Sequence, residues 1–162
     1  MEYLSPTLGL FFIGQEYIKF IYNMKHYIDT ELEFINLEDS KYKDYLKKIQ
    51  YNGLIGKIDD VEICFLHYNS IDEAKQKWNR RKKRINWKKI VYKFNDQNFC
   101  RYEDLKAFDS FDAKNKICFT AKKYDEFDTI QIKEYEKNEY VLDDIKSYKK
   151  YFNVYNFLNN IK

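Results

Sequence analysis

VEICFLHYNSIDEAKQKWNRRKKRINWKKIVYKF, residues 61–94, places two apolar runs on either side of a helical pattern. The runs cover 61–66 and 89–94 and are rich in the β-branched and aromatic residues that favour strands. The apolar residues between them recur at helical spacing: Ile71, Ala74, Trp78 and Ile85. Ser70 is placed to cap this helix. A strand, a helix and a second strand in this order predict a right-handed crossover between parallel strands.

The rest of the chain continues this alternation in both directions. We expect further helices over 15–29, 40–51, 102–108 and 147–158, and further strands over 116–120 and 129–135. Residues 5–7 are expected to be extended, and turns are expected at Asn52-Gly53 and Gly56. The predicted fold class is α/β: a three-layer, mostly parallel sheet with helices on both faces, Rossmann-like, in a single domain over 1–162. The Gly-x-Gly-x-x-Gly fingerprint of dinucleotide-binding folds is absent from the sequence.

Composition excludes several classes of protein. With 44% hydrophobic and 19% aromatic residues, the 162-residue chain is too apolar to be disordered. Four Gly and one Pro are too few for a flexible linker or a collagen-like repeat. The longest apolar run, 8–13, is far shorter than the roughly 20 residues that span a bilayer. We therefore expect a soluble cytoplasmic protein, associated with a membrane only through its surface.

The net charge of +3 conceals one concentrated basic segment. Residues 74–89 contain nine of the 29 Lys and Arg and no acidic residue, so the remainder of the chain is acidic. Such a patch favours a local anionic partner, such as a phosphate, a nucleotide or an anionic membrane surface, over general nucleic-acid binding. Arg80, Arg81 and Arg84 are the candidate contacts. A solvated surface helix is the alternative interpretation.

The three cysteines, Cys64, Cys100 and Cys118, are too widely spaced for a disulfide framework or a Cys-x-x-Cys motif. They indicate a reducing compartment. Cys64 and Cys118 each stand in an Ile-Cys-Phe triplet, where a thiol behaves as a small buried hydrophobe. With two histidines in the chain, the sequence predicts no transition-metal site and leaves any cofactor unknown.

Polar side chains follow three of the predicted strands, and these strand ends form the candidate site. The first end offers His67 and Asn69, the second Asp96, Asn98 and Cys100, and the third Thr120 and Lys122. His67 or Asp96 would act as a general base, and Lys122 would hold a phosphate. The amide and hydroxyl side chains would bind sugar hydroxyls.

Each candidate has a structural alternative. His67 could make an ordinary hydrogen bond at a strand end, and Asp96 and Asn98 could form turns by bonding to their own backbone. Cys100 precedes the predicted helix 102–108, whose backbone N–H groups would lower the thiol pKa and favour a nucleophile. The alternative for Cys100 is a partly buried loop residue.

Several strings of the sequence stand out: Ser5-Pro6-Thr7-Leu8-Gly9-Leu10, Gly56-Lys57-Ile58-Asp59-Asp60-Val61-Glu62-Ile63, Phe65-Leu66-His67-Tyr68, Trp78-Asn79-Arg80-Arg81-Lys82-Lys83-Arg84-Ile85-Asn86-Trp87 and Tyr102-Glu103-Asp104-Leu105. Together they resemble a bacterial family of unknown function whose members are often labelled exopolysaccharide biosynthesis proteins. The resemblance implies a three-layer α/β fold and a place among genes for surface polysaccharides, without an established reaction. It also implies a preceding strand, ending in an Asn-Cys-Trp-Gly-Gly-like segment, that this chain is expected to lack.

Two functions follow from these observations. The first is an enzyme of bacterial surface polysaccharide biosynthesis, a transferase acting on a nucleotide-sugar, a sugar phosphate or a lipid-linked saccharide. The second is a noncatalytic accessory protein that binds an anionic membrane surface or a pathway partner through the basic helix 75–84. A nucleic-acid-binding module is disfavoured, because the sequence outside the patch is acidic and shows no nucleic-acid motif.

Overall fold

The computed structural model describes residues 9–161. The chain divides between Ile85 and Asn86 into two compact units, unit 1 and unit 2, and each is described by itself. That the two form a single domain stays a prediction. The extended segment expected at residues 5–7 lies outside the described residues.

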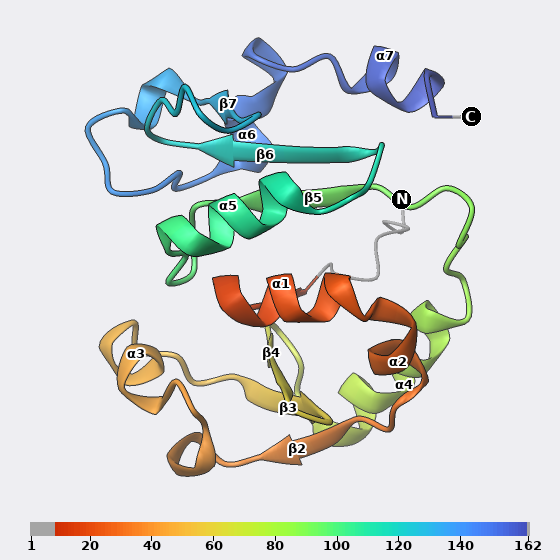
Figure 1. Ribbon diagram of the computed structural model, residues 1–162. Helices are drawn as coiled ribbons and strands as arrows, with labels where there is room; N and C mark the ends of the chain where they lie inside the picture. The colour runs from red at the N-terminus through yellow and green to blue at the C-terminus, as the bar shows by residue number, and fades with distance from the viewer. Residues whose placement is uncertain (1–8, 162) are drawn as a thin grey trace. The chain divides into compact units, whose positions relative to one another are not determined.

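Unit 1 is built around a four-stranded sheet of order β1-β4-β3-β2 (Figure 1). Its strands are β1 (Leu10–Phe11), β2 (Glu33–Ile35), β3 (Leu54–Ile58) and β4 (Val61–Phe65). Its helices are α1 (Gly14–Tyr22), α2 (Met24–Asp29), the 3₁₀ turn η1 (Leu37–Asp39), α3 (Lys43–Lys48) and α4 (Ile71–Lys82). Neighbouring strands in this sheet are antiparallel.

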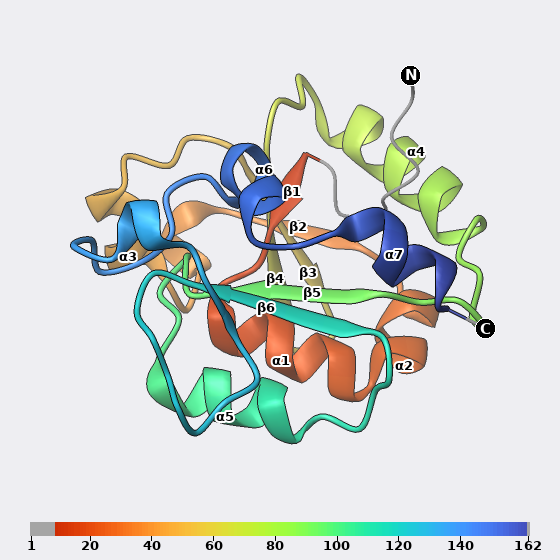
Figure 2. The same ribbon diagram turned by 90° about the horizontal axis from the view of Figure 1, so that it is seen from above.

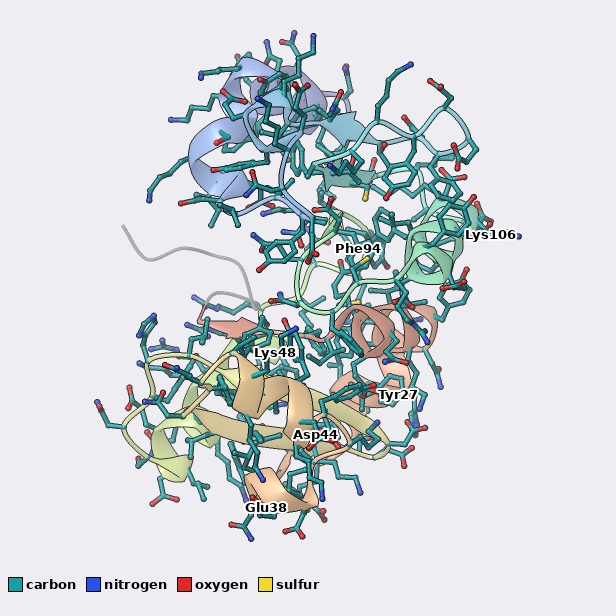
Figure 3. The ribbon with its side chains drawn as sticks, turned by 90° about the vertical axis from the view of Figure 1, so that its left-hand side faces the viewer. Tyr27, Glu38, Asp44, Lys48, Phe94 and Lys106 are labelled. Atoms are coloured by element: carbon teal, nitrogen blue, oxygen red, sulfur yellow. The ribbon has the colours of Figure 1, made fainter. Side chains whose placement is uncertain are left out.

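A tight hairpin joins β3 to β4. Only Asp59 and Asp60 separate the two strands, and Asp59 adopts the left-handed conformation with φ 53°. Asp60 accepts hydrogen bonds from Lys19 Nζ at 2.5 Å and from the hydroxyl of Tyr27, labelled in Figure 3, at 2.9 Å. The turn is thereby held on α1 and α2. A two-residue connection is too short for a crossover, so β3 and β4 must be antiparallel.

Gly56 stands inside β3, where the sequence predicts a turn. A Cβ atom at this position would lie 2.6 Å from Cε2 of Phe65 and 2.8 Å from Cδ1 of Leu32. Glycine therefore allows these side chains to lie directly against the strand. The predicted turn is wrong because Gly56 serves close packing within a strand.

The sheet of unit 1 is buried on both faces around its inner strand β4. Leu46 of α3 packs against Ile55 and Cys64, which stand opposite each other in β3 and β4. The alternate residues Ile63 and Phe65 point to the other face and are 0% and 1% exposed. All five residues of β4 are buried.

A buried carboxylate ties α1 to this sheet. Glu16 Oε2 accepts a hydrogen bond from the backbone N–H of Glu62 at 2.7 Å. Glu16 Oε1 accepts from the Tyr42 hydroxyl at 2.6 Å and from Lys41 Nζ at 2.8 Å. Glu62 is also buried and accepts from the Ser40 hydroxyl at 2.6 Å. Ser40 therefore bonds to the sheet instead of capping a helix at 40, and α3 begins three residues later.

Unit 2 contains a small parallel sheet of order β5-β6-β7. Figure 2 shows β5 and β6 side by side. Its strands are β5 (Tyr92–Asn95), β6 (Lys116–Thr120) and β7 (Ile130–Gln131). Its helices are α5 (Tyr102–Ser110), η2 (Lys133–Tyr135), α6 (Asp144–Ser147), η3 (Tyr148–Lys150) and α7 (Val154–Asn159).

The two faces of the unit 2 sheet pack against different helices (Figure 1). Phe94 of β5, labelled in Figure 3, packs on Phe108 of α5 with ring centroids 5.2 Å apart. Phe119 of β6 points to the opposite face, where its ring lies 6.0 Å from that of Phe152, between η3 and α7. The β5–α5–β6 crossover is thus a helix-covered parallel pair, as expected for this part of the sequence.

The predicted three-layer, mostly parallel, Rossmann-like sheet is wrong for the chain. Parallel pairing is confined to the three short strands of unit 2, and the larger sheet is antiparallel. The strands β4 and β5 belong to different sheets, so α4 does not connect parallel neighbours. The error has a physical source: a strand buried on both faces is a continuous apolar run, which is typical of parallel sheets but here belongs to an antiparallel one.

Several elements are shorter than the sequence predicts. The helix expected over 15–29 divides at Asn23 into α1 and α2. The helix expected over 147–158 divides because Asn153 caps α7, its side chain accepting from the N–H of Asn156 at 3.0 Å. The strand expected over 129–135 is reduced to the two residues of β7. None of the helices within residues 9–161 is long and apolar enough to cross a membrane.

Candidate functional site

The carboxyl ends of β5 and β6 lie at one edge of the unit 2 sheet, because the two strands are parallel neighbours. We call residues 96–101, which follow β5, and residues 120–122, which begin with the last residue of β6, the carboxyl edge. Ligands of parallel sheets bind at such edges. The edge collects the following residues predicted from sequence: Asp96, Asn98, Cys100, Thr120 and Lys122.

Asp96 is buried and joins two other segments of unit 2. Its Oδ2 accepts a hydrogen bond from the N–H of Ala121 at 2.6 Å, and its Oδ1 accepts from the N–H of Val141 at 2.8 Å. Burial raises the pKa of this carboxyl above its usual range, although both hydrogen bonds act in the opposite direction. These contacts give Asp96 a structural function, and its use as a general base stays a prediction.

The part of the carboxyl edge at residues 120–122 makes hydrogen bonds within unit 2. Thr120 is 0% exposed, and its hydroxyl donates to the carbonyl of Lys122 at 2.8 Å. The exposed ammonium of Lys122 donates to the carbonyl of Glu136 at 2.6 Å. The side chain of Gln97 donates to the carbonyl of Leu142 at 2.8 Å. Thr120 is therefore inaccessible to a ligand, whereas the ammonium of Lys122 is exposed although it bonds to the segment 136–142.

Cys100 lies just before α5, as the sequence predicts. Its pKa is nevertheless raised, mainly by burial and further by the carboxylates of Asp104 and Asp96. Asp104 also accepts a hydrogen bond from the N–H of Arg101 at 2.9 Å, so a carboxylate already occupies the start of the helix. The direction of the pKa shift is opposite to the one expected from the helix start. A nucleophilic function for Cys100 stays a prediction.

Asn98 and Phe99 form an open part of the edge. Both have left-handed backbone conformations, with φ 54° and 60°. Asparagine adopts this conformation at low cost, but a bulky residue such as Phe99 does so only under constraint. Phe99 is 51% exposed. The amide of Asn98 makes no hydrogen bond within residues 9–161, so it can donate to and accept from a ligand hydroxyl.

Three aromatic side chains near this edge form what we call the aromatic rim: Tyr102, Tyr124 and Phe127. Tyr102 is the first residue of α5 and is 49% exposed. The ring of Phe127 lies 5.1 Å from that of Tyr102 and 5.6 Å from that of Tyr124, between centroids. Burial raises the pKa of Tyr124, and the charges of Asp96 and Cys100 raise it further.

His67 and Asn69 follow β4 and so belong to unit 1. Because β4 belongs to a different sheet from β5 and β6, these two residues are not part of the carboxyl edge. The segment serves the start of α4: the N–H of Asn69 donates to Glu73 Oε2 at 3.0 Å, and Ser70 Oγ accepts from the N–H of Glu73 at 3.1 Å. His67 is exposed in a left-handed conformation, φ 60°. Its function as a base stays a prediction.

Five of the nine basic residues of 74–89 lie on α4, which ends at Lys82, and the other four follow its end. Trp78 on its apolar stripe is buried. Arg81 Nη1 donates to the hydroxyl of Tyr68 at 2.6 Å, so this guanidinium is held by its own unit. Arg80 and Arg84 are exposed.

Unit 1 contains a polar pocket of about 350 Å³ that the sequence analysis missed. It is lined by Lys19, Ile35, Asp39, Lys41, Lys57, Asp60 and Glu62. Much of its charge is balanced within the protein, since Lys41 pairs with Glu16 at 2.8 Å and Lys57 stands between Glu33 and Glu62 across the sheet. In the part of the chain that the structure describes, no group of His, Cys, Asp and Glu is arranged to hold a metal ion.

Comparison with known proteins identifies the family. Residues 1–162 match the family described as "Domain of unknown function (DUF1919)". A protein of Haemophilus influenzae, described as uncharacterized, is 30% identical over 159 residues, which cover 95% of this chain and 71% of that protein. The chain belongs to the DUF1919 family. Membership confirms the resemblance to a family of unknown function, whereas the link to exopolysaccharide is a proposal.

In this DUF1919 chain, sequence reasoning missed the aromatic rim. Tyr102 was noted only as the start of a helix, and many of the 16 Tyr and 13 Phe could serve as core. A usable signal was present in the loop 121–129, where Tyr124 and Phe127 stand among charged residues without a strand or helix period. Aromatic residues in such a polar loop are candidates for ligand contact.

Proposed function

We propose that this chain acts in the biosynthesis of a bacterial surface polysaccharide and binds a phosphorylated or nucleotide-linked sugar at the carboxyl edge of unit 2. The proposal depends chiefly on one observation: the segments that follow β5 and β6 carry both the aromatic rim and the amide of Asn98, which is unbonded within residues 9–161. A sugar ring or a base can stack on Tyr102 while its hydroxyls bond to the amide. Lys122 supplies an exposed ammonium for a phosphate at this edge.

The transfer reaction is the finer part of the proposal. In a glycosyl transfer a base takes the proton of the acceptor hydroxyl while the sugar leaves its phosphate. Asp96 is the candidate base of the carboxyl edge, and it would have to release a backbone hydrogen bond to act. His67 and Cys100 remain candidates from the sequence. A lipid-linked saccharide is the third possible substrate class.

Binding can be tested by isothermal titration with nucleotide-sugars, sugar phosphates and free nucleotides. We expect Tyr102→Ala to weaken binding at least fivefold, because losing an aromatic stacking contact costs roughly 1–3 kcal/mol. Asn98→Gly removes the amide but keeps the left-handed backbone, and it should also weaken binding. Tyr155→Ala is the matched control, since Tyr155 is 75% exposed on α7 of the same unit and lies outside both the rim and the segment 136–142. Equal affinities in all three variants would contradict the proposed site.

A second candidate function is that of an accessory protein that binds an anionic membrane surface or a pathway partner through the basic segment 75–84, which comprises the end of α4 and the two residues that follow it. It is favoured by the side chains of Lys75, Lys83 and Arg84, which make no ion pair within residues 9–161. Substituting Lys83 and Arg84 with Glu should abolish salt-sensitive binding to vesicles containing phosphatidylglycerol. Arg81 is a poorer choice, because its bond to Tyr68 would also be lost. Unchanged vesicle binding would exclude this function.

A further inference from the structure

Unit 2 contains an apolar pocket of about 160 Å³ between one face of its sheet and the C-terminal helices. Ile117 and Phe119 of β6 form its floor, and Phe157 and Leu158 of α7 form a wall. Lys93 is the one charged residue in its lining. This face is opposite to the one on which α5 packs, so the pocket is separate from the buried contact between Phe94 and Phe108.

The surface around the pocket is also apolar. Ile145 and Leu158, which both line the pocket, are 66% and 51% exposed. Phe157 and Val154 of α7, which also line the pocket, are partly exposed. Large exposed apolar side chains gathered around a hollow are typical of a surface that binds an apolar ligand.

The charges beside the pocket are mainly positive. Lys93 Nζ lies 2.7 Å from the carboxylate of Asp144, and this pair is balanced. Lys149, next to the pocket residue Tyr148, and Lys89, two residues before the pocket residue Val91, make no ion pair in the described chain. The other charged side chains of this segment are paired with one another: Lys146 with Asp143, and Lys150 with Glu134. The unbalanced charge around the hollow is therefore cationic.

We propose that this pocket binds one hydrocarbon chain of an anionic membrane lipid, with Lys149 and Lys89 near its phosphate. The apolar lining suits the chain, because each methylene removed from water favours binding. The positive flank selects an anionic headgroup over a neutral one. This site is distinct from the carboxyl edge and from α4, and the inference does not depend on sugar binding.

The first test measures binding of alkyl phosphates with six, eight and ten carbons, each below its micelle concentration, by isothermal titration. Burial of about 0.8 kcal/mol per methylene predicts a three- to fourfold gain in affinity for each carbon that enters the pocket. Alkyl glucosides of the same lengths are the headgroup control and should bind more weakly at low salt. Absence of binding, or affinity independent of chain length, overturns the proposal.

Two matched variants of α7 locate the binding. Leu158→Glu introduces a charge into the pocket wall, and Tyr155→Glu introduces the same charge on the same helix outside the lining. Both residues are exposed, so both variants should fold. We expect Leu158→Glu to weaken octyl phosphate binding at least tenfold and Tyr155→Glu less than twofold.

Headgroup and self-association are tested separately. Lys149→Gln should weaken binding of octyl phosphate and not of octyl glucoside, whereas Lys137→Gln, in a loop outside the pocket, should change neither. Equal effects of Leu158→Glu and Tyr155→Glu overturn the proposal. So does a concentration-dependent dimer that Leu158→Glu dissociates without any effect on alkyl phosphate binding, since a second copy of the chain would then be the occupant.

Discussion

Oδ2 of Asp96 accepts a hydrogen bond from the backbone N–H of Ala121 at 2.6 Å, which fastens the end of β5 to the end of β6. The other oxygen of the same carboxylate holds the N–H of Val141 at 2.8 Å. One buried side chain thus satisfies two backbone donors that would otherwise be buried without partners. Its position at the end of β5 made Asp96 a candidate base, and the same position allows its carboxylate to stabilise the fold.

Asp96→Asn should destabilise the protein by about 2–3 kcal/mol, because an amide has one acceptor oxygen and its NH₂ group would face a backbone donor. Urea unfolding measures the loss. Hydrogen exchange should become faster at Ala121 and Val141 in particular. Asp125→Asn is the control, since Asp125 is an exposed loop residue and its substitution should change stability little. Unchanged exchange at both amides would contradict the structural function of the Asp96 carboxylate.

Gly56→Ala should destabilise the protein by about 1–3 kcal/mol, because the new methyl group would overlap Phe65 and Leu32. Unfolding in urea gives the magnitude. A double-mutant cycle with Leu32→Ala tests the cause, since removing one of the two crowding side chains should relieve part of the strain. Strictly additive effects would show that crowding by Leu32 is not the reason.

Gly56 also shows why only part of the fold could be predicted from the sequence. The pattern of residues 102–120 correctly predicts α5, β6 and the parallel pairing of β5 with β6, because these local signals agree with the packing. A glycine such as Gly56 is compatible either with a turn or with close packing inside a strand. Only the position of Phe65 in the folded protein distinguishes the two. Once β3 is taken for a turn, its antiparallel pairing with β4 is lost and the unit 1 sheet cannot be predicted.

The candidate site was predictable only in part for a similar reason. Sequence placed Asp96, Asn98 and Lys122 at strand ends, and the parallel pair β5–β6 does bring them to one edge. The sequence does not show that the segment 136–142 returns to that edge and binds Asp96 through Val141. His67 was assigned to the same edge because one sheet was assumed, and β4 proved to belong to another sheet.

Glu16→Gln should destabilise unit 1 by about 2–3 kcal/mol. The buried carboxylate accepts from the N–H of Glu62, the hydroxyl of Tyr42 and the ammonium of Lys41, and an amide cannot accept all three. Unfolding curves should show the loss. Glu38→Gln removes an exposed ion pair with Lys47 and should have little effect. Similar stability of the two variants would argue against a structural function of the buried network.

The three cysteines should react slowly with a thiol reagent such as 5,5′-dithiobis(2-nitrobenzoate) at pH 8. Burial raises the pKa of Cys64 to about 12 and raises those of Cys100 and Cys118, so little reactive thiolate is present in the folded protein. Reaction should be at least about tenfold faster in urea, because each pKa unit changes the thiolate fraction tenfold. Cys100 is the least buried and should react first, a phase that Cys100→Ser removes. Rapid reaction of Cys100 in the native protein would instead support a nucleophile.

Glu134 should contribute to acid sensitivity. Hydrogen bonds from Lys150 and Tyr151 lower the pKa of its carboxyl to about 2 in the folded protein, below the value of about 4.3 expected for an unfolded chain. The folded state therefore binds this proton less tightly, so the contribution is complete above the unfolded pKa and is lost as the pH falls from about 5 to 2. Glu134→Gln should flatten the dependence of the free energy of unfolding on pH in this window and leave it unchanged near pH 7.

Glu136→Gln is a matched control, because Glu136 makes no ion pair in the described residues. A pH profile of Glu134→Gln parallel to that of the unmodified protein would show that the contact with Lys150 does not persist in solution, and high salt should reduce the difference because both partners are exposed.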